Sequence, residues 1–339
     1  MILSLAGSVL GQGIGGACQG YDAKVAQKAA HFAGCSCVIN NYTDEIKNWS
    51  YEQCVAAQSD PSQMKDITVF HSKVTNMMVF VAYDQEKNWT VVSFRATVCD
   101  QKGEDILVDL DKILMKYDDW GCENKSCRIH QGFYLGYKSL LLQKFDKKVF
   151  EVAKERRSEK ILITGISLGG GLAAIAAYDL HRRLESQYNV ESLAPGVMVY
   201  TFGEPRIGNK DLVEEINSIA GLYIYRVVLE KDPVPHLPPR LNPLKLNSTN
   251  VTKNDPEFQY FHPGYEVFYK FSDSSAKPVV SAGDNIYCES NKITFSFQFN
   301  GCNHMDYPSL SRKYPETECI KTSTNRNDFN IPLLTAGFE

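Results

Sequence analysis

The stretch TGISLGGG, residues 164–171, constrains the fold of this chain more than any other. It places Ser167 between Gly165 and Gly169, after the β-like run KILIT and before the helix-like run LAAIAAYDLHRRL. A G-x-S-x-G pattern that closes a strand and opens a helix forces a sharp turn, which lifts the serine hydroxyl above the sheet edge at a helix N-terminus. The glycines are needed because side chains would collide where strand and helix nearly touch. The alternative is an ordinary helix start with Ser167 as its N-cap.

Apolar runs around this unit repeat the alternation of strand and helix. Buried strands are predicted at GVMVYTFG (196–203) and LYIYRVV (222–228), with a helix over 210–220 between them. This alternation is typical of an α/β fold with a mostly parallel central sheet and crossover helices, and we expect one domain over residues 21–339. The other predicted elements are a helix within 21–40, a hairpin of MMVFVAYD (77–84) and WTVVSFRA (89–96), one helix over 133–154, strands at YEVFYKF (265–271) and ITFSFQF (293–299), and a long surface loop over 237–263.

Composition narrows the classes of partner. With 339 residues, 43% of them hydrophobic, the chain can bury the core of one large domain. A net charge of -4 without a basic patch argues against nucleic-acid binding. No apolar run reaches the length of about 18 residues that a membrane-spanning helix needs. We expect a monomer that needs no metal and no cofactor.

Cysteines and glycosylation sequons indicate the compartment. Ten cysteines without the paired C-x-x-C units of a zinc site favour disulfides. The N-x-[ST] sequons of the chain, which favour the secretory pathway, begin at Asn41, Asn48, Asn88, Asn124, Asn247 and Asn250. We therefore expect a secreted protein, or one of the secretory or lysosomal lumen. Residues 1–20, which begin MILSLAGSVLG without a basic region, are either a minimal signal peptide or a disordered N-terminus.

A serine hydroxyl becomes a nucleophile when an imidazole removes its proton and a carboxylate orients that imidazole. In strand–turn–helix hydrolases the chain order is serine, acid, histidine. Asp232, in the proline-stiffened loop DPVPHLPP after a strand, is the candidate acid, with Glu230 as the spare. His304, beyond the last strand-like run, is the candidate base, and His262 is the second choice. The excluded histidines precede the serine, lie on the helix after it or share the short loop of the acid: His31, His71, His130, His181 and His236.

Seven motifs, in order from about residue 79 to 307, resemble the class 3 (fungal-type) lipase family of α/β-hydrolases. They are VVSFRAT, IHQGF, TGISLGGGLA, YTFGEPRIGN, DPVPHLPP, FHPGYEVFY and CNHMDY. The resemblance implies an α/β-hydrolase fold with Ser167 as nucleophile, Asp232 as acid and His304 as base. It also implies an oxyanion hole formed by the backbone N–H and hydroxyl of Thr97 and by the backbone N–H of Leu168.

Two positions depart from the family pattern. Ile166 stands where the family usually has histidine, which affects local packing and not the chemistry. Ala96 stands where the family usually has glycine, and its Cβ could shift the oxyanion loop. The resemblance gives no role to the extra cysteines of the first ~60 residues.

The function that the resemblance implies is hydrolysis of lipid carboxylic esters, most directly of acylglycerols, through an acyl-Ser167 intermediate. A feruloyl-type or phospholipid esterase of the same fold stays open, because GEPRIGN and a short segment like Cys122–Cys127 also occur in the feruloyl branch. So does a catalytically inactive relative that only binds lipid, although the intact serine, acid and histidine argue against it.

Local spacing predicts two disulfides. Cys288 and Cys302 flank a hairpin-like run and would pin the loop of His304, and Cys122–Cys127 is the second local pair. The alternative is a bridge from these cysteines to an N-terminal cluster, whose members are Cys35, Cys37 and Cys54.

The segment VCDQKGEDILVDLDKILMKY (98–117) follows FRAT, where family lipases carry a mobile lid. As a helix, it would place its apolar residues on one face: Ile106, Leu107, Leu110, Ile113 and Leu114. Such a lid would cover the serine when closed and meet acyl chains at a lipid–water interface when open. The acidic residues on the other face favour neutral lipid over anionic membranes. A fixed surface segment that leads into a strand is an equally good interpretation.

Overall fold

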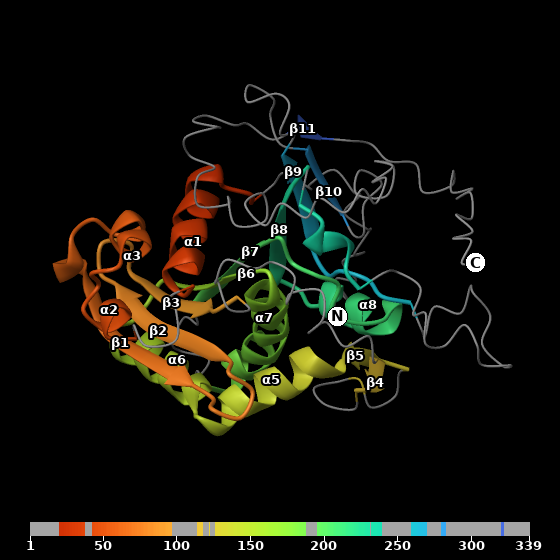
Figure 1. The fold of residues 1–339 in the computed structure, drawn as a ribbon, viewed down its shortest axis with the longest axis horizontal. Coiled ribbons are helices and arrows are strands. Elements are labelled where there is room, and N and C mark those ends of the chain that lie inside the picture. Colours follow the sequence, from red (N-terminus) through yellow and green to blue (C-terminus); the bar gives the residue numbers. More distant parts are fainter. Residues whose placement is uncertain are drawn as a thin grey trace, which may run out of the picture.

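The computed structural model describes residues 20–37, 43–96, 114–117, 122, 126–187, 195–230, 232–238, 259–269, 279–282 and 320–321. Within this part of the chain an α/β fold surrounds one large sheet (Figure 1). Its nine described strands follow the order β1-β2-β3-β6-β7-β8-β9-β10-β11. Their bounds are β1 Met64–His71, β2 Met78–Asp84, β3 Trp89–Phe94, β6 Lys160–Ile166, β7 Gly196–Phe202, β8 Tyr223–Leu229, β9 Tyr265–Tyr269, β10 Val279–Ala282 and β11 Ile320–Lys321.

The sheet is mostly parallel, as the alternation of strand and helix predicted. β3, β6, β7, β8 and β9 are successive parallel neighbours. β2 pairs antiparallel with β3, which confirms the predicted hairpin, and β1 extends that edge. β10 pairs antiparallel with β9 at the other edge. The carboxyl ends of β3, β6, β7 and β8 therefore meet at one edge of the sheet, where open α/β folds carry their functional groups.

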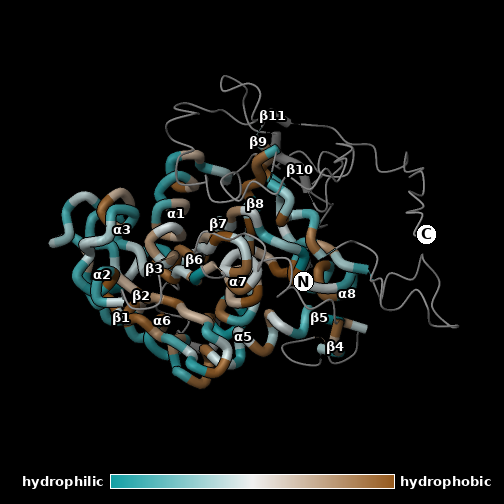
Figure 2. Tube along the Cα trace, in the orientation of Figure 1, coloured by the Kyte–Doolittle hydropathy of each residue, from teal (hydrophilic) through white to brown (hydrophobic). Residues whose placement is uncertain are grey.

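Helices cover both faces, because the strands alternate apolar side chains between two separate cores. In β2, Val79 and Val81 belong to one core, and Phe80 and Ala82 to the other. One face carries α1 Ala23–Cys35, α2 Thr43–Lys47 and α3 Glu52–Ala57; the other carries α5 Gln131–Leu142, α6 Phe145–Glu155, α7 Leu168–Gln187 and α8 Lys210–Asn217. Figure 2 shows hydrophobic segments along the central strands and α7, with hydrophilic segments around the periphery. No helix of the described residues is long and apolar enough to cross a membrane.

The N-terminal helix α1, predicted from its apolar spacing, is fixed to the sheet by buried hydroxyl groups. Ser93 and Thr164 donate hydrogen bonds to carbonyl oxygens of α1 at 2.9 and 3.2 Å. Ser36, directly after α1, has its hydroxyl 3.0 Å from the carbonyl oxygen of Phe94 at the end of β3. α1 therefore contacts the strand end from which the oxyanion loop of the family would start.

Two predictions about secondary structure need correction, and one strand was missed. The single helix over 133–154 is two helices, because Lys144 adopts φ 64°, a left-handed conformation that cannot continue a right-handed helix. β1 was not predicted; it is partly exposed along most of its length, so its residues show no clear alternation. The predicted surface loop over 237–263 ends in buried residues, since Tyr260 is fully buried and His262 is 3% exposed.

The segment before the short β4–β5 sheet bears on the lid prediction. β4 (Leu114–Lys116) pairs antiparallel with β5 (Arg128–His130). The helical interpretation is therefore wrong at Leu114, which is a strand residue in the described chain. Ile106, Leu107, Leu110 and Ile113 lie outside the described residues.

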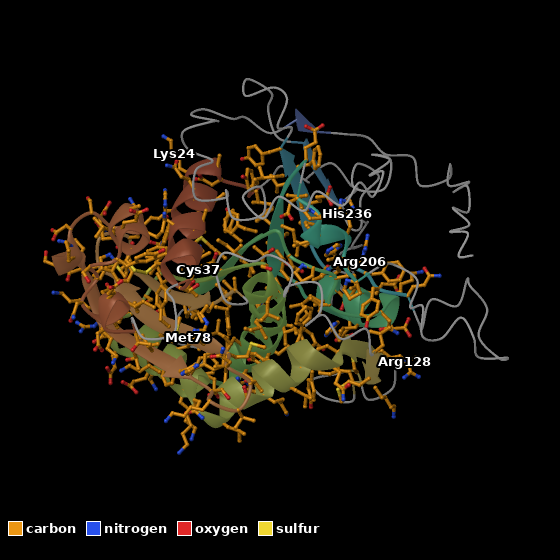
Figure 3. All side chains as sticks on the ribbon, viewed as in Figure 1. Lys24, Cys37, Met78, Arg128, Arg206 and His236 are labelled. Atoms are coloured by element: carbon orange, nitrogen blue, oxygen red, sulfur yellow. A yellow bond between two sulfur atoms is a disulfide. The ribbon has the colours of Figure 1, made fainter. Side chains whose placement is uncertain are left out.

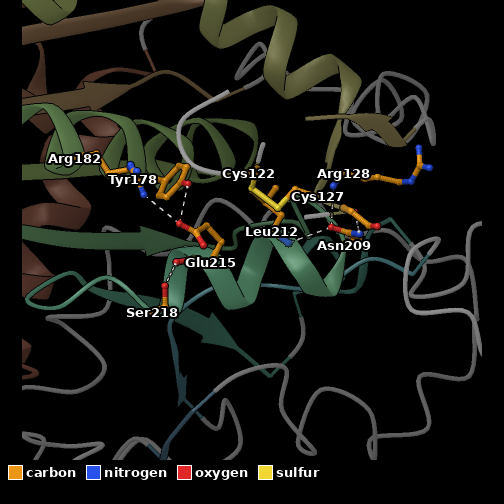
Figure 4. Close-up of a disulfide and its surroundings, with 10 residues drawn as sticks. Cys122, Cys127, Arg128, Tyr178, Arg182, Asn209, Leu212, Glu215 and Ser218 are labelled. Atoms are coloured by element: carbon orange, nitrogen blue, oxygen red, sulfur yellow. Dashed lines mark hydrogen bonds and ion pairs between the residues drawn. A yellow bond between two sulfur atoms is a disulfide. The ribbon is translucent and has the colours of Figure 1, made fainter. Parts of the chain in front are cut away.

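Two disulfides are present among the described cysteines. The predicted Cys122–Cys127 bridge is confirmed, and it lies between β4 and β5, near the N-terminus of α8 (Figure 4). Cys35 bridges to Cys54 and so joins α1 to α3. Cys288 and Cys302 lie outside the described residues, so their predicted pairing stays a prediction.

Candidate active site

Ser167 forms the turn between β6 and α7. Its φ is 57°, in the left-handed region that a non-glycine residue rarely adopts, at a cost of about 1–3 kcal/mol. Its backbone N–H donates to the carbonyl of Phe202 at 2.9 Å, which ties the turn to β7. The residue is 1% exposed, and its Oγ has no hydrogen-bond partner among the described residues. A strained, buried and unpartnered hydroxyl is more than an ordinary N-cap requires, and it suits a nucleophile.

The glycines on either side of the serine allow the strand, the turn and the helix to approach closely. A Cβ at Gly165 would lie 2.2 Å from the carbonyl oxygen of Gly169. A Cβ at Gly169 would lie 2.4 Å from the carbonyl oxygen of Phe94. Both contacts are with backbone, which cannot rotate away, so only glycine fits at either position.

The candidate oxyanion donors lie where β3 and α7 meet. Leu168 is the first residue of α7, so its N–H has no acceptor within the helix and lies at the positive end of the helix dipole. Thr97 lies outside the described residues. Ala96, the last described residue before it, is 3% exposed and does not adopt a positive φ. The glycine that the family usually has at position 96 is therefore not needed for the backbone of this chain.

Asp232 follows β8 and is completely buried. Its Oδ1 accepts a hydrogen bond of 2.9 Å from the backbone N–H of Val234, and its own N–H donates to the carbonyl of Leu229. β6 and β8 flank β7, so the ends that carry Ser167 and Asp232 are about 10 Å apart, a gap that an imidazole between them can span. Glu230, the spare candidate, is only partly buried.

Of the two candidate bases, the structure describes only His262. His262, the second-choice base, is 3% exposed, and its Nε2 donates to the backbone carbonyl of Glu204 at 3.0 Å. It packs at the start of β9, as its position before that strand predicted. His304, the preferred base, lies outside the described residues.

His130 is a buried histidine that the sequence analysis excluded as the base. It precedes α5, is 1% exposed and stacks on the ring of Phe133, with ring centroids 4.3 Å apart. Neither ring nitrogen has a hydrogen-bond partner among the described residues. Burial away from water lowers the pKa of His130 from 6.5 to about 4, so the imidazole is neutral at physiological pH.

Residues 203–209, with the sequence GEPRIGN, connect three loops at the sheet edge. Arg206 Nη1 donates to the carbonyls of His236 and Pro238, at 2.6 and 2.9 Å, in the loop that begins with Asp232 (Figure 3 labels Arg206 and His236). The N–H of Phe261 donates to Gly208, and Glu204 accepts from the histidine before β9.

The same segment also reaches the short sheet. Asn209 caps α8 by accepting from the N–H of Leu212. It also accepts from the N–H of Arg128 at 2.9 Å and donates to the carbonyl of Ser126, beside the Cys122–Cys127 disulfide (Figure 4). The motif alone indicates no role for Arg206 or Asn209. Their partners are backbone atoms of distant loops, which leave no pattern in the sequence.

Comparison with known proteins relates this site to one family. Residues 91–242 match the family model described as Lipase (class 3). The chain is 25% identical over 253 residues to a lipase of Rhizopus niveus, covering 75% of this chain and 57% of the relative. It is 27% identical over 194 residues to a protein named secreted mono- and diacylglycerol lipase of Malassezia globosa, covering 57% of this chain and 52% of the relative. The chain thus spans little more than half the length of these relatives.

Solved structures agree in fold. The structure of lipase II from Rhizopus niveus matches with a TM-score of 0.56 at 24% identity, covering 72% of this chain and 79% of that one. A mono- and diacylglycerol lipase from Aspergillus oryzae matches with a TM-score of 0.57 at 23% identity, covering 77% and 86%. Both share the α/β architecture described above. Over residues 91–242, the chain is therefore a sequence relative of the class 3 lipase family.

Proposed function

We propose that this chain hydrolyses lipid carboxylic esters, most directly acylglycerols, with Ser167 as nucleophile. The observation that carries the proposal is the buried, unpartnered Ser167 hydroxyl on a left-handed turn between β6 and α7. Asp232 supports it, because this residue is buried at the end of β8, two strands away from β6 in the sheet. The names of the relatives, lipase and mono- and diacylglycerol lipase, support the substrate class.

In the proposed reaction, Ser167 Oγ attacks the ester carbonyl while His304 takes its proton and Asp232 orients the imidazole. The N–H of Leu168 and the N–H and hydroxyl of Thr97 stabilise the oxyanion, and each donor contributes about 3 kcal/mol to transition-state binding. His304 then gives the proton to the leaving alcohol. Water activated by the same histidine releases the fatty acid from Ser167.

The cellular setting belongs to the same proposal. Residues 21–339 form one hydrolase domain, and the protein acts outside the cell or in the secretory or lysosomal lumen. The described disulfides, which persist in oxidising compartments, support this setting, as does the word "secreted" in the name of the Malassezia globosa relative.

The decisive experiment labels the nucleophile. A fluorophosphonate probe should attach to the wild-type chain at Ser167, and Ser167→Ala should lose both the label and the hydrolysis of a soluble ester. Ser218→Ala, which changes a serine at the end of α8, is the matched control and should keep both. Label on another residue, or full activity of Ser167→Ala, overturns the proposal, and an unlabelled, inactive wild type indicates a lipid-binding relative.

The base is tested by two histidine variants. His304→Ala should lower kcat roughly 10⁴-fold, as loss of a triad member does. His262→Ala should mainly lower stability, because His262 supports the backbone at Glu204. The opposite pattern makes His262 the base.

Substrate class needs its own panel, because the Cys122–Cys127 disulfide also fits the feruloyl-type branch. Triglycerides, phospholipids and feruloyl esters should be compared, with the highest kcat/KM expected for glycerides. If residues 104–113 form a lid, the rate should jump at the solubility limit of a glyceride. An Ile106→Ser/Leu110→Ser variant should lose that jump and still cleave a soluble ester.

A further inference from the structure

Three large apolar side chains are exposed close together on the described surface. Val74 is 94% exposed, Leu142 is 80% exposed and Leu135 is 50% exposed. Val74 lies in the turn between β1 and β2, and both leucines lie on α5. We call this surface the hairpin–α5 patch. Single exposed apolar residues are common, but a cluster at these exposures marks an interaction surface.

Two contacts hold the hairpin turn against α5. Thr75 Oγ1 lies 2.6 Å from Ser139 Oγ, and Ser139 follows Leu135 by four residues and precedes Leu142 by three. Leu135, Ser139 and Leu142 therefore lie on one face of α5, and the hairpin turn contacts the middle of that face. Met77, at the other end of the turn, packs against Gly136, where an added Cβ would lie 3.0 Å from its methyl carbon. The patch is thus a preformed surface.

Within the described hairpin turn and α5, the charged residues are of one sign. Residues 72–77 and 131–145 contain no aspartate or glutamate. Lys73, Lys144 and Lys147 are exposed and make no ion pair within the described part of the chain. Lys138, on the same face of α5, has its ammonium 5.4 Å from the ring centroid of Tyr134. Asp146, the nearest acid in sequence, is buried and paired with Arg183. An apolar surface with a basic rim suits the boundary between lipid headgroups and acyl chains.

The patch lies at the sheet edge that carries Ser167. The carbonyl of Met78, which follows the hairpin turn, accepts a hydrogen bond from the N–H of Arg95 at the end of β3. The ring of Phe145, at the start of α6, packs edge-on against Phe94, with centroids 5.6 Å apart. The carbonyl of Phe94 in turn lies against Gly169 in the serine turn. Figure 1 shows the β1–β2 turn beside the junction of α5 and α6.

We propose that the hairpin–α5 patch docks this protein on an anionic lipid surface, with Val74, Leu135 and Leu142 inserted among acyl chains and the lysines against the headgroups. The inference deepens the proposed function, on which it rests, because it places the serine edge at the lipid. A symmetric pair of chains would bring the two lysine rims face to face, so the charges favour a lipid surface over a second copy. The acidic residues at 104–111 predict neutral lipid instead, so the choice of headgroup is a sharp test.

The test measures vesicle binding in the Ser167→Ala background, where no lipid is consumed. Vesicles of phosphatidylcholine alone are compared with an equal mixture of phosphatidylcholine and phosphatidylglycerol. The mixed vesicles should bind more tightly, and Val74→Ser/Leu135→Gln/Leu142→Gln should weaken that binding roughly tenfold or more. Lys73→Gln/Lys144→Gln/Lys147→Gln should abolish the preference for mixed vesicles and its dependence on salt.

The matched control is Val55→Ser/Tyr223→Ser, which removes two exposed apolar side chains elsewhere on the surface. It should bind vesicles like the parent. When Ser167 is left intact, the patch variant should have the melting temperature of the wild type and should hydrolyse a soluble ester at the same rate. Equal vesicle binding by the patch variant and the control overturns the docking proposal, as does a concentration-dependent dimer that the patch substitutions abolish. Vesicle binding does not depend on catalysis, so an inactive chain that still binds through the patch contradicts only the proposed function.

Discussion

Replacing His130 with phenylalanine tests how one buried imidazole affects acid stability. The side chain is 1% exposed, and its surroundings in the described chain are aromatic: Phe133 stacks on it, and the ring of Tyr260 is 5.9 Å away. No charged partner contributes to its pKa, which burial lowers from 6.5 to about 4. The folded state therefore holds this imidazole neutral at a pH where the unfolded state already protonates it.

The sign and size of the effect follow from proton linkage. Between pH 6.5 and about 4 the unfolded state binds a proton at His130 that the folded state does not, so the free energy of unfolding falls as the pH falls. A difference of about 2.5 between those pKa values, at about 1.4 kcal/mol per pH unit, corresponds to about 3.5 kcal/mol. The folded protein has this free energy of unfolding in full above pH 6.5, and it has lost about 3 kcal/mol of it by about pH 4.

Urea unfolding at a series of pH values measures it. The difference in unfolding free energy between the wild type and His130→Phe should change by about 3 kcal/mol from neutral pH to about pH 4. The contribution of the carboxylates is the same in both proteins, so it cancels in this difference. His181→Gln, which removes a partly exposed histidine on α7, is the control and should leave the slope of the wild type nearly intact. Parallel curves for the wild type and His130→Phe refute the reasoning.

Three further outcomes are expected. Gly165→Ala should lower the free energy of unfolding by roughly 3 kcal/mol or more and remove most of the activity, because the added Cβ meets backbone at 2.2 Å. Gly171→Ala is the control: its Cβ meets side chains at 3.3 Å, so it should destabilise clearly less in thermal unfolding. Arg206→Met should lower kcat on a soluble ester by roughly tenfold to a hundredfold with little change in KM, because it releases the loop of Asp232, the proposed catalytic acid. Arg206→Lys should restore only part of the rate. Cys35→Ala/Cys54→Ala should lose about 3 kcal/mol in urea unfolding, the value for a loop of 19 residues, and wild-type stability of this variant would contradict a structural role.

Sequence predicted the centre of this fold because local signals and tertiary structure agree there. The runs at 160–165, 196–203 and 222–228 are apolar throughout, as buried parallel strands are, and the glycines around Ser167 are dictated by backbone contacts within the same short segment. The serine turn is therefore visible in eight consecutive residues. The choice of Asp232 as candidate acid has the same kind of basis, a strand followed by a proline-rich loop, and its role stays a prediction.

Features that depend on distant partners were not predicted. Nothing in residues 133–154 signals a left-handed Lys144, because the apolar spacing continues across the break between α5 and α6. The role of Arg206 depends on carbonyls at positions 236 and 238, which any residue type provides. His304, Thr97 and the lid residues lie outside the described residues and stay predictions.

The attachment of α1 to the sheet also has a consequence for the order of folding. α1 and α3 are close in sequence, and the Cys35–Cys54 bridge can join them while the rest of the chain is still being made. The carbonyl of Ala29 in α1, however, accepts its hydrogen bond from Thr164 only after β6 has been made. The buried face of α1 also packs in one core with Tyr200 and Phe202, which come later still in the chain. During synthesis, the apolar face of α1 stays without its partner strands until residues 160–202 have left the ribosome. Although α1 is made early, it is therefore among the last described helices to reach its place, and a chaperone that holds nascent chains would bind there.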